Sequence, residues 1–368
     1  VWNDGVRAEK LADLFNEKHN RTVNREYNGD HLVLHGSNPA IILRKHQKSA
    51  VWRGIQDRNL LLDHAVGAGK TFVGAAIIME YKRLGIARKP ILVVPNHLTT
   101  QWRSEFARIY PAANVLAANP DDFSKANRQR MFSKIALGEY DAVIIGHSSL
   151  TKIGLDPAIE EGIYKEQIDE IANAIEAMKN ERGDRGIVRD MEKIKANLEA
   201  KVEKLRALAG VRDKVVTFDE LGIDGMFIDE MHEFKNLFFT TQMQRVSGLG
   251  NPKGSGKAFD LFAKVRWLTK TYGEKVPFIT ATGTPVSNSL SEMFTMQRYM
   301  KYDEMKRDGL HLFDSWARMY GDVESLYEVA PSGVGYRISQ RFSKFKNLPS
   351  LMAHYRTFAD TVRLQDLK

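Results

Sequence analysis

The sequence predicts an α/β fold in which helices cover both faces of a parallel sheet. Short β-branched apolar runs alternate with stretches of helical periodicity along most of the 368 residues, and this alternation is typical of a parallel α/β core. A glycine-rich turn, AVGAGKT, stands between an apolar run and a strongly helical segment. A hydrophobic fraction of 43% supplies the side chains for a large core, which excludes a disordered chain.

The elements of this core follow in order along the chain. A lead-in over residues 1–40 carries helical spacing at 6–18 and a predicted strand at 31–36. An apolar run begins at Asn59 and leads into the glycine turn and its helix. Further strands are predicted where short β-branched runs are closed by polar residues, at 90–95, 140–146, 224–229 and 276–282.

Residues 156–214 interrupt this alternation as an insertion. Apolar side chains spaced three and four apart run from Ile163 to Met178 and again from Ile187 to Leu205, with a glycine-bearing break between them. We therefore expect an antiparallel helical hairpin. We interpret it as a strut with a solvated, charged face, and an arm that binds DNA or a protein partner is the alternative.

Composition excludes several classes of protein. The absence of cysteine excludes disulfides, thiol catalysis and thiolate metal sites, and His46, His97 and His147 have no partners at zinc-ligand spacing. No apolar run approaches the roughly 18 residues of a membrane span, and the first residues lack the apolar stretch of a secretory signal. We expect a soluble, cytoplasmic protein with no membrane partner. The net charge of +8 suits an anionic partner.

The glycine turn predicts a phosphate-binding loop over Ala65–Thr71. Backbone N–H groups of such a turn and of the following helix N-terminus can cradle phosphate oxygens. Lys70 would pair with the β- and γ-phosphates, and the Thr71 hydroxyl would bind Mg²⁺. His64 stands where the strict GxxxxGK[ST] pattern has its first glycine.

An acidic pair, Asp229–Glu230, ends a predicted strand 159 residues after Lys70. Asp229 can hold Mg²⁺ through water, and Glu230 can orient the attacking water or take its proton. With His232, the pair forms the sequence of a DExH motif. An acidic pair alone is more typical of a solvated strand end, but together with the phosphate loop it indicates ATP hydrolysis.

Two further segments carry glycine and hydroxyl groups. TATGTPVSN at 280–288 follows an apolar run, so its hydroxyls can hydrogen-bond the acidic pair and relay the state of the nucleotide to a bound partner. GSGK at 254–257 resembles a phosphate loop, but no strand precedes it. We interpret GSGK as a basic lead-in to a helix, with contact to DNA phosphates as the alternative.

The order of these motifs resembles helicase superfamily two, and within it the Swi/Snf-type DNA-dependent ATPases. The resemblance covers residues 43–295 and includes DEMHEFKN at 229–236, whose Lys-Asn is a Swi/Snf-type feature. Met231 departs from the usual alanine, and the hairpin is an insertion. The other matching segments are LRKHQKSAVWRGI, GAGKT, ILVVPNHLTTQWRSEF, YDAVIIGHSSL and TGTPVSNSLSEM.

A closer resemblance is to the helicase part of large phage- and plasmid-borne proteins that join an adenine-specific DNA methyltransferase to a Swi/Snf-like helicase. It rests on the lead-in HLVLHGSNPA, on GKAFDLFAKVRWL and on FKNLPSLMAHYRTFAD. The 368 residues contain no methyltransferase motif, so that activity is not inferred.

The resemblance implies a RecA-like lobe over 41–300 and a linker over 301–368 that leads towards a second RecA-like lobe. Helical spacing returns in this tail at 313–327 and 350–360. In the family, the second lobe supplies arginines to the ATP site, and ISQRFSKF does not reproduce their spacing. The chain is therefore expected to be an incomplete motor.

The function implied is ATP-driven translocation on, or remodelling of, double-stranded DNA, with ATP and Mg²⁺ as cofactors. A nucleotide-regulated DNA- or protein-binding module without sustained hydrolysis and a strand-separating helicase are the alternatives. DNA contacts should be mostly to phosphate, because a translocase steps without reading sequence.

The resemblance gives each site residue a role. Adenine would be read by Arg44 and Gln47, and the phosphates would be held by Gly67, Ala68, Gly69, Lys70 and Thr71. Thr71 and Asp229 would bind Mg²⁺, and Glu230 would activate water. Nucleotide state would be coupled to DNA by His232, Thr282, Gly283 and Thr284. DNA would be contacted by Pro95, Asn96, His147, Ser148, Lys235 and Asn236.

Overall fold

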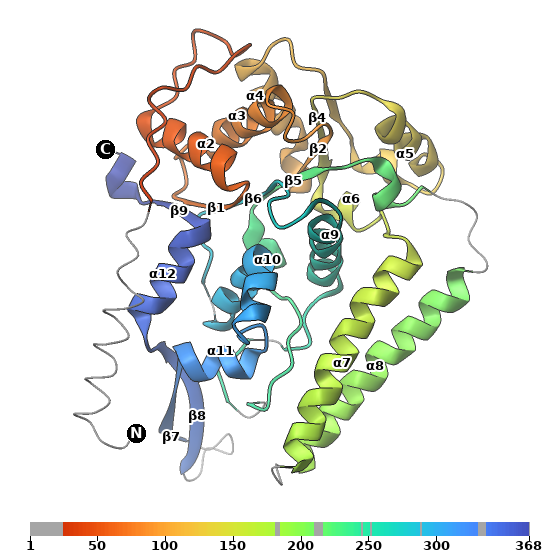
Figure 1. Cartoon of the computed structure of the whole chain (residues 1–368), viewed down its shortest axis with the longest axis vertical. Coiled ribbons are helices and arrows are strands. Elements are labelled where there is room, and N and C mark those ends of the chain that lie inside the picture. Colours follow the sequence, from red (N-terminus) through yellow and green to blue (C-terminus); the bar gives the residue numbers. More distant parts are fainter. Residues whose placement is uncertain are drawn as a thin grey trace.

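The computed structural model describes residues 25–180, 185–209, 216–243, 246–250, 252–287, 289–329 and 336–367. These residues build a parallel sheet with helices on both faces, beside which a two-helix hairpin and a small two-stranded ribbon lie (Figure 1). The predicted α/β architecture, a parallel sheet between two layers of helices, is confirmed. The helix predicted at 6–18 lies outside the described residues. In the described part of the chain, no helix combines the length and apolarity needed to cross a bilayer.

The main sheet has seven strands in the order β3-β4-β2-β5-β6-β1-β9, and every pairing is parallel. The five central strands are almost entirely buried, as expected where helices cover both faces. The strands are β1 (Asn59–His64), β2 (Pro90–Val94), β3 (Val115–Ala117), β4 (Ala142–Gly146), β5 (Gly225–Asp229), β6 (Phe278–Thr282) and β9 (Ala359–Val362).

Alternate strand residues enter two separate cores. Leu60 and Leu62 of β1 pack on one face, whereas Leu61 packs on the other. The first face is covered by α2 (Lys45–Asp57), α3 (Lys70–Arg83) and α4 (Thr99–Ile109). The second face is covered by α5 (Arg128–Leu137), α9 (Gly256–Tyr272), α10 (Ser291–Arg307), α11 (Phe313–Tyr320) and α12 (Leu348–Phe358). The short α6 (His147–Leu150) follows β4 directly.

The predicted hairpin is formed by α7 (Pro157–Asn180) and α8 (Arg185–Ala209), which lie side by side (Figure 1). Helix α7 also docks on the lobe, because the Tyr164 ring stacks on Phe259 with centroids 4.4 Å apart. Glu166 pairs with Lys306 at 2.8 Å and with Lys270 at 3.3 Å. The hairpin is therefore joined to the lobe along α7, and a partner for it stays a prediction.

The strand predicted at 31–36 is wrong. These residues form turns and irregular backbone, and the His31 ring packs edge-on against Trp52 at 4.5 Å. Leu32 and Leu34 of the apolar run are half-buried against the core beneath α2, but β1 already has β6 and β9 as its two neighbours. The segment therefore covers α2 instead of adding to the sheet.

The tail also departs from the prediction. The helix expected over 313–327 ends at Tyr320, and β7 (Gly321–Val329) pairs antiparallel with β8 (Tyr336–Phe345). The helix expected over 350–360 is α12, and β9 after it joins the main sheet beside β1. The lobe therefore does not end at residue 300 as we expected, because its edge strand comes from residues 359–362. A route from there to a second lobe stays a prediction.

Candidate active site

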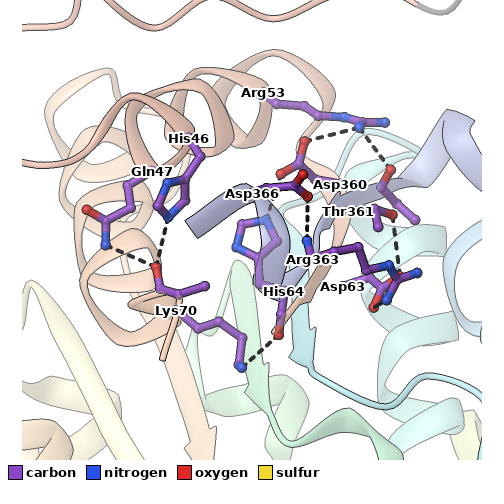
Figure 2. A network of polar contacts seen from close by, with 12 residues as sticks. His46, Gln47, Arg53, Asp63, His64, Lys70, Asp360, Thr361, Arg363 and Asp366 are labelled. Atoms are coloured by element: carbon purple, nitrogen blue, oxygen red, sulfur yellow. Dashed lines mark hydrogen bonds and ion pairs between the residues drawn. The ribbon is translucent and has the colours of Figure 1, made fainter. Parts of the chain in front are cut away.

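The glycine turn forms a tight loop between β1 and α3. Gly67 and Gly69 have φ values of 85° and 80°, a left-handed conformation that costs other residues about 1–2 kcal/mol. Gly69 immediately precedes α3, so the free N–H groups of the first helical turn face the loop. The Lys70 ammonium donates to the His64 carbonyl at 3.0 Å and to the Ala65 carbonyl at 3.4 Å (Figure 2).

Helix α2 supports this loop from one side. Gln47 is buried, and its amide nitrogen donates to the Ala68 carbonyl at 3.2 Å. A His46 ring nitrogen donates to the same carbonyl at 3.1 Å (Figure 2). The Gln47 amide oxygen accepts from the Arg44 backbone N–H at 2.8 Å, while Arg44 itself is exposed. The structure therefore places Gln47 at the edge of the phosphate loop, whereas Arg44 is joined to Gln47 through its backbone alone.

The acidic pair lies at the carboxyl end of β5, two strands away from the loop. Asp229 is 6% exposed, and its carboxylate accepts from the Trp102 indole at 2.9 Å and from the Glu230 backbone N–H at 3.0 Å. Burial raises the pKa of Asp229, against which the Trp102 hydrogen bond and the positive charge of Lys70 act. The positive charge of Lys70 therefore favours the ionised form of Asp229.

Glu230 has a left-handed backbone, with φ 52° and ψ 54°, which is uncommon and costly for a residue with a side chain. Its carboxylate lies 3.1 Å from Nδ1 of His232. The same Nδ1 lies 3.1 Å from the Thr282 hydroxyl, which also accepts from the Thr284 backbone N–H at 3.1 Å. A chain of polar contacts thus links the acidic pair to the loop after β6.

The loop after β6 also reaches the phosphate loop. A Cβ added to Gly283 would lie 3.3 Å from the His64 carbonyl oxygen and 3.7 Å from the Val66 nitrogen. The two loops are therefore packed backbone to backbone. Contacts therefore run from the acidic pair to the phosphate loop through the predicted coupling residues His232, Thr282, Gly283 and Thr284.

A cavity of about 590 Å³ opens beside the acidic pair, between the loops that follow β2, β4 and β5. Four predicted DNA-contacting residues, Pro95, Asn96, His147 and Ser148, line it. Its remaining lining residues are His97, Leu98, Thr151, Glu230, His232, Glu233 and Lys257. The cavity thus joins the predicted DNA loops to the predicted catalytic carboxylate.

The other two predicted DNA-contacting residues lie elsewhere. The Lys235 ammonium binds Glu292 at 3.0 Å and the Ser287 hydroxyl at 2.7 Å. Asn236 is exposed, and its backbone carbonyl accepts from Ser255 at 2.8 Å. Lys235 is thus held against α10, and it does not line the cavity.

Lys257 at this cavity comes from the GSGK segment. Ser255 caps α9 by accepting from the Ala258 N–H, which agrees with our interpretation of GSGK as a lead-in to a helix. The Lys257 ammonium pairs with Glu233 at 3.1 Å and lies 4.5 Å from the centre of the Phe234 ring. The sequence offered contact with DNA phosphates only as an alternative role for this segment, on the signal of a basic charge at a glycine turn.

A second network, which sequence reasoning missed, ties β1 to β9 beneath the phosphate loop. His64 is fully buried and its Nε2 lies 2.6 Å from Asp360, which Arg53 also approaches at 3.4 Å (Figure 2). Burial raises the pKa of Asp360, but the hydrogen bonds and charges of His64 and Arg53 outweigh it and lower that pKa overall. Asp63 pairs with Arg363 at 3.1 Å. These contacts therefore join β1, the strand that ends at the phosphate loop, to the tail.

Comparison with known proteins agrees with this geometry. Residues 52–362 match the model of a protein family described as "Probable helicase domain". The chain belongs to this family. The match ends at the last residue of β9, so the family region includes the tail strand that we had placed in a linker.

A structural likeness was also found to a Sulfolobus solfataricus SWI2/SNF2 ATPase core in complex with dsDNA, with 14% sequence identity and a TM-score of 0.39. The likeness covers 75% of this chain and 40% of that one, so this chain corresponds to less than half of that structure's length. No curated protein matches the sequence.

Proposed function

We propose that this helicase domain is the ATP-binding lobe of a Swi/Snf-type, DNA-dependent ATPase that moves along or remodels duplex DNA. The observation that carries the proposal is the meeting of three groups that phosphoryl transfer needs. The glycine loop before α3 and the Lys70 ammonium follow β1, and the buried Asp229 carboxylate ends β5, so all three lie at the carboxyl edge of the sheet on either side of β6. Ligands of open α/β sheets bind at this edge.

The residues present fit Mg²⁺-ATP. Lys70 lies on two backbone carbonyls of its own loop, and phosphate oxygens would be better partners for an ammonium than neutral carbonyls are. Thr71 and Asp229 would hold Mg²⁺, which prefers oxygen ligands and would neutralise charge on the phosphates. Glu230 would orient the attacking water, with its carboxylate held by His232.

DNA would lie across the loops that line the cavity. Asn96 is exposed there, Ser148 is half-buried, and Lys257 supplies a positive charge in the same lining. Hydroxyl, amide and ammonium groups of this kind bind phosphate oxygens without reading bases, which suits an enzyme that steps along DNA. We propose that a second RecA-like lobe completes the ATP site, as the sequence resemblance implies.

Nucleotide binding is the first test. The full chain would be titrated with a fluorescent ATP analogue, with and without Mg²⁺, and ATP and GTP would compete for the site. We expect Mg²⁺-dependent binding that prefers ATP and is lost in Lys70→Ala. Lys235→Ala is the matched control, because that lysine is held against α10. Failure of the wild-type chain to bind ATP would refute the assignment of the nucleotide site.

Steady-state hydrolysis with and without duplex DNA separates the remaining possibilities, with Glu230→Gln as the blank. Hydrolysis that rises with DNA and disappears in the variant supports a motor that is active in this chain. ATP binding without hydrolysis supports an incomplete site or a nucleotide-regulated binding module, which addition of a second lobe would distinguish. Because the family is described as a helicase, strand displacement on a forked duplex tests the strand-separating alternative.

A further inference from the structure

His147 occupies a position that does not suit direct contact with DNA. It is the first residue of α6, directly after β4, and it is 5% exposed. Its ring packs edge-on against Phe234 with centroids 5.0 Å apart. One ring nitrogen, Nε2, lies 2.9 Å from the backbone carbonyl oxygen of Asp229. A carbonyl only accepts hydrogen bonds, so Nε2 carries the proton and donates it.

The group that His147 holds is the peptide that joins Asp229 to Glu230. Its carbonyl accepts from His147, and its N–H donates to the Asp229 carboxylate at 3.0 Å. Both polar atoms of one peptide are therefore fixed. The residue that follows this peptide, Glu230, has the left-handed backbone conformation. Rotation of the peptide would swing the Glu230 side chain away from His232, which it approaches at 3.1 Å.

The other side of His147 faces the cavity. Ser148, the next residue, is half-buried, and its backbone N–H and its hydroxyl both donate to the Asn96 side-chain oxygen at 3.1 Å. Asn96 follows β2, so this bond joins two loops of the cavity wall. A phosphate that binds Ser148 would compete for its hydroxyl and its N–H. Ser148, which would contact the phosphate, is the direct neighbour of His147, whose ring binds the Asp229 carbonyl.

We propose that His147 is a positioning residue that couples occupation of the cavity by duplex DNA to the orientation of Glu230. This inference rests on the proposed function, because it assigns the route by which bound DNA and bound ATP would influence each other. The hydrogen bond from Nε2 to the Asp229 carbonyl is the essential link. A shift of the turn at Ser148 moves the imidazole, and the imidazole moves the peptide that sets Glu230.

The test uses three substitutions that separate hydrogen bonding from packing. Gln places an amide N–H at about the reach of Nε2, so His147→Gln keeps the donor. Asn has the same chemistry but is one carbon shorter, so His147→Asn loses it. His147→Phe keeps the ring packing on Phe234 and removes the donor. His35→Phe, an exposed histidine of the lead-in, is the matched control.

The readout is the coupling between two ligands in the full chain. The affinity for a non-hydrolysable, fluorescent ATP analogue with Mg²⁺ is measured with and without a saturating 20-base-pair duplex, and the duplex affinity is measured with and without nucleotide. The two ratios must agree, because coupling is reciprocal. We expect a ratio of about 5–150 in the wild type that is retained in His147→Gln and falls to about 1 in His147→Asn and His147→Phe. The affinity for each ligand measured in the absence of the other should change by less than about threefold.

The outcomes distinguish this inference from the function beneath it. An unchanged ratio in His147→Asn and His147→Phe would overturn the role of His147 and leave the ATPase proposal intact. A wild-type ratio of 1, with both ligands bound, would also overturn it. A wild-type chain that binds no nucleotide would instead refute the proposed function. Where the chain hydrolyses ATP, His147→Asn should lower kcat with DNA while leaving KM for ATP unchanged.

Discussion

Alanine at Gly69 should cost far more than alanine at Gly67, although both glycines have nearly the same backbone conformation. Their φ values are 80° and 85°, so each substitution incurs about 1–2 kcal/mol of left-handed strain. The space around them differs. A Cβ at Gly67 meets nothing within 4 Å, whereas a Cβ at Gly69 would lie 2.1 Å from the Gln47 amide nitrogen.

The additional cost at Gly69 follows from what Gln47 does. The amide nitrogen and the amide oxygen of this buried side chain make hydrogen bonds at 3.2 and 2.8 Å, and a shift large enough to relieve the clash breaks both. At about 0.5–1.5 kcal/mol for each hydrogen bond, Gly69→Ala should cost about 2–5 kcal/mol in total. Gly67→Ala should stay near 1–2 kcal/mol.

Urea denaturation of the two variants and of Gln47→Ala measures these costs. In the Gln47→Ala background the clash is gone, so Gly69→Ala should cost no more there than Gly67→Ala does. The interaction energy of this double-mutant cycle should be about 1–3 kcal/mol. Equal costs for the two glycine variants in the wild-type background, or a cycle that closes to zero, would refute the reasoning.

Three further predictions concern buried charges. Trp102→Phe removes the indole donor to Asp229 and should lower the free energy of unfolding by about 1.5–3 kcal/mol at pH 7. Burial already raises the pKa of Asp229, so its folded state favours the proton. The loss of stability in the variant should therefore be smaller when urea denaturation is repeated at pH 4. In Asp360→Asn, the free energy of unfolding should fall less steeply between pH 6 and pH 3 than in the wild type. His64 and Arg53 lower the folded pKa of Asp360 despite its burial, so the stabilisation that its carboxylate provides is lost only as pH falls. A variant that keeps the wild-type pH slope would contradict this. Lys264→Met removes a fully buried cation and leaves Asp260, whose side chain is 25% exposed, without its ionic partner, and it should cost about 1–3 kcal/mol. Adding Asp260→Leu should restore most of the loss in a thermal melt.

The sequence was sufficient for elements whose signal is local. The strands predicted at 90–95 and 224–229 are β2 and β5 within one residue at each end, because a buried parallel strand is a continuous apolar run. The glycine turn likewise fell where β1 ends and α3 begins. Its two left-handed glycines and the helix N-terminus are encoded within a few residues, which is why the phosphate loop could be located from its motif.

The elements that the sequence did not predict depend on contacts between distant residues. Strand β9 has four residues and follows directly on α12, so its apolar positions continue a helical pattern. It becomes a strand because β1 offers an open edge almost 300 residues earlier. The 31–36 segment shows the converse error, since its short apolar run is typical of a strand but β9 occupies the edge beside β1.

The candidate site shows the same division between local and distant information. Motifs singled out Lys70, Asp229 and Glu230, whose residue types the proposed chemistry requires, but they did not show what holds these residues in place. Trp102 reaches Asp229 across 127 residues and His64 reaches Asp360 across 296. His147 was assigned to DNA because its loop resembles a DNA-contacting segment, yet the backbone carbonyl that it binds cannot be read from any side-chain pattern. A side chain that performs chemistry must be of a particular type, so a motif can find it. A side chain that positions it must only lie at the right place in the fold, so the sequence pattern does not show it.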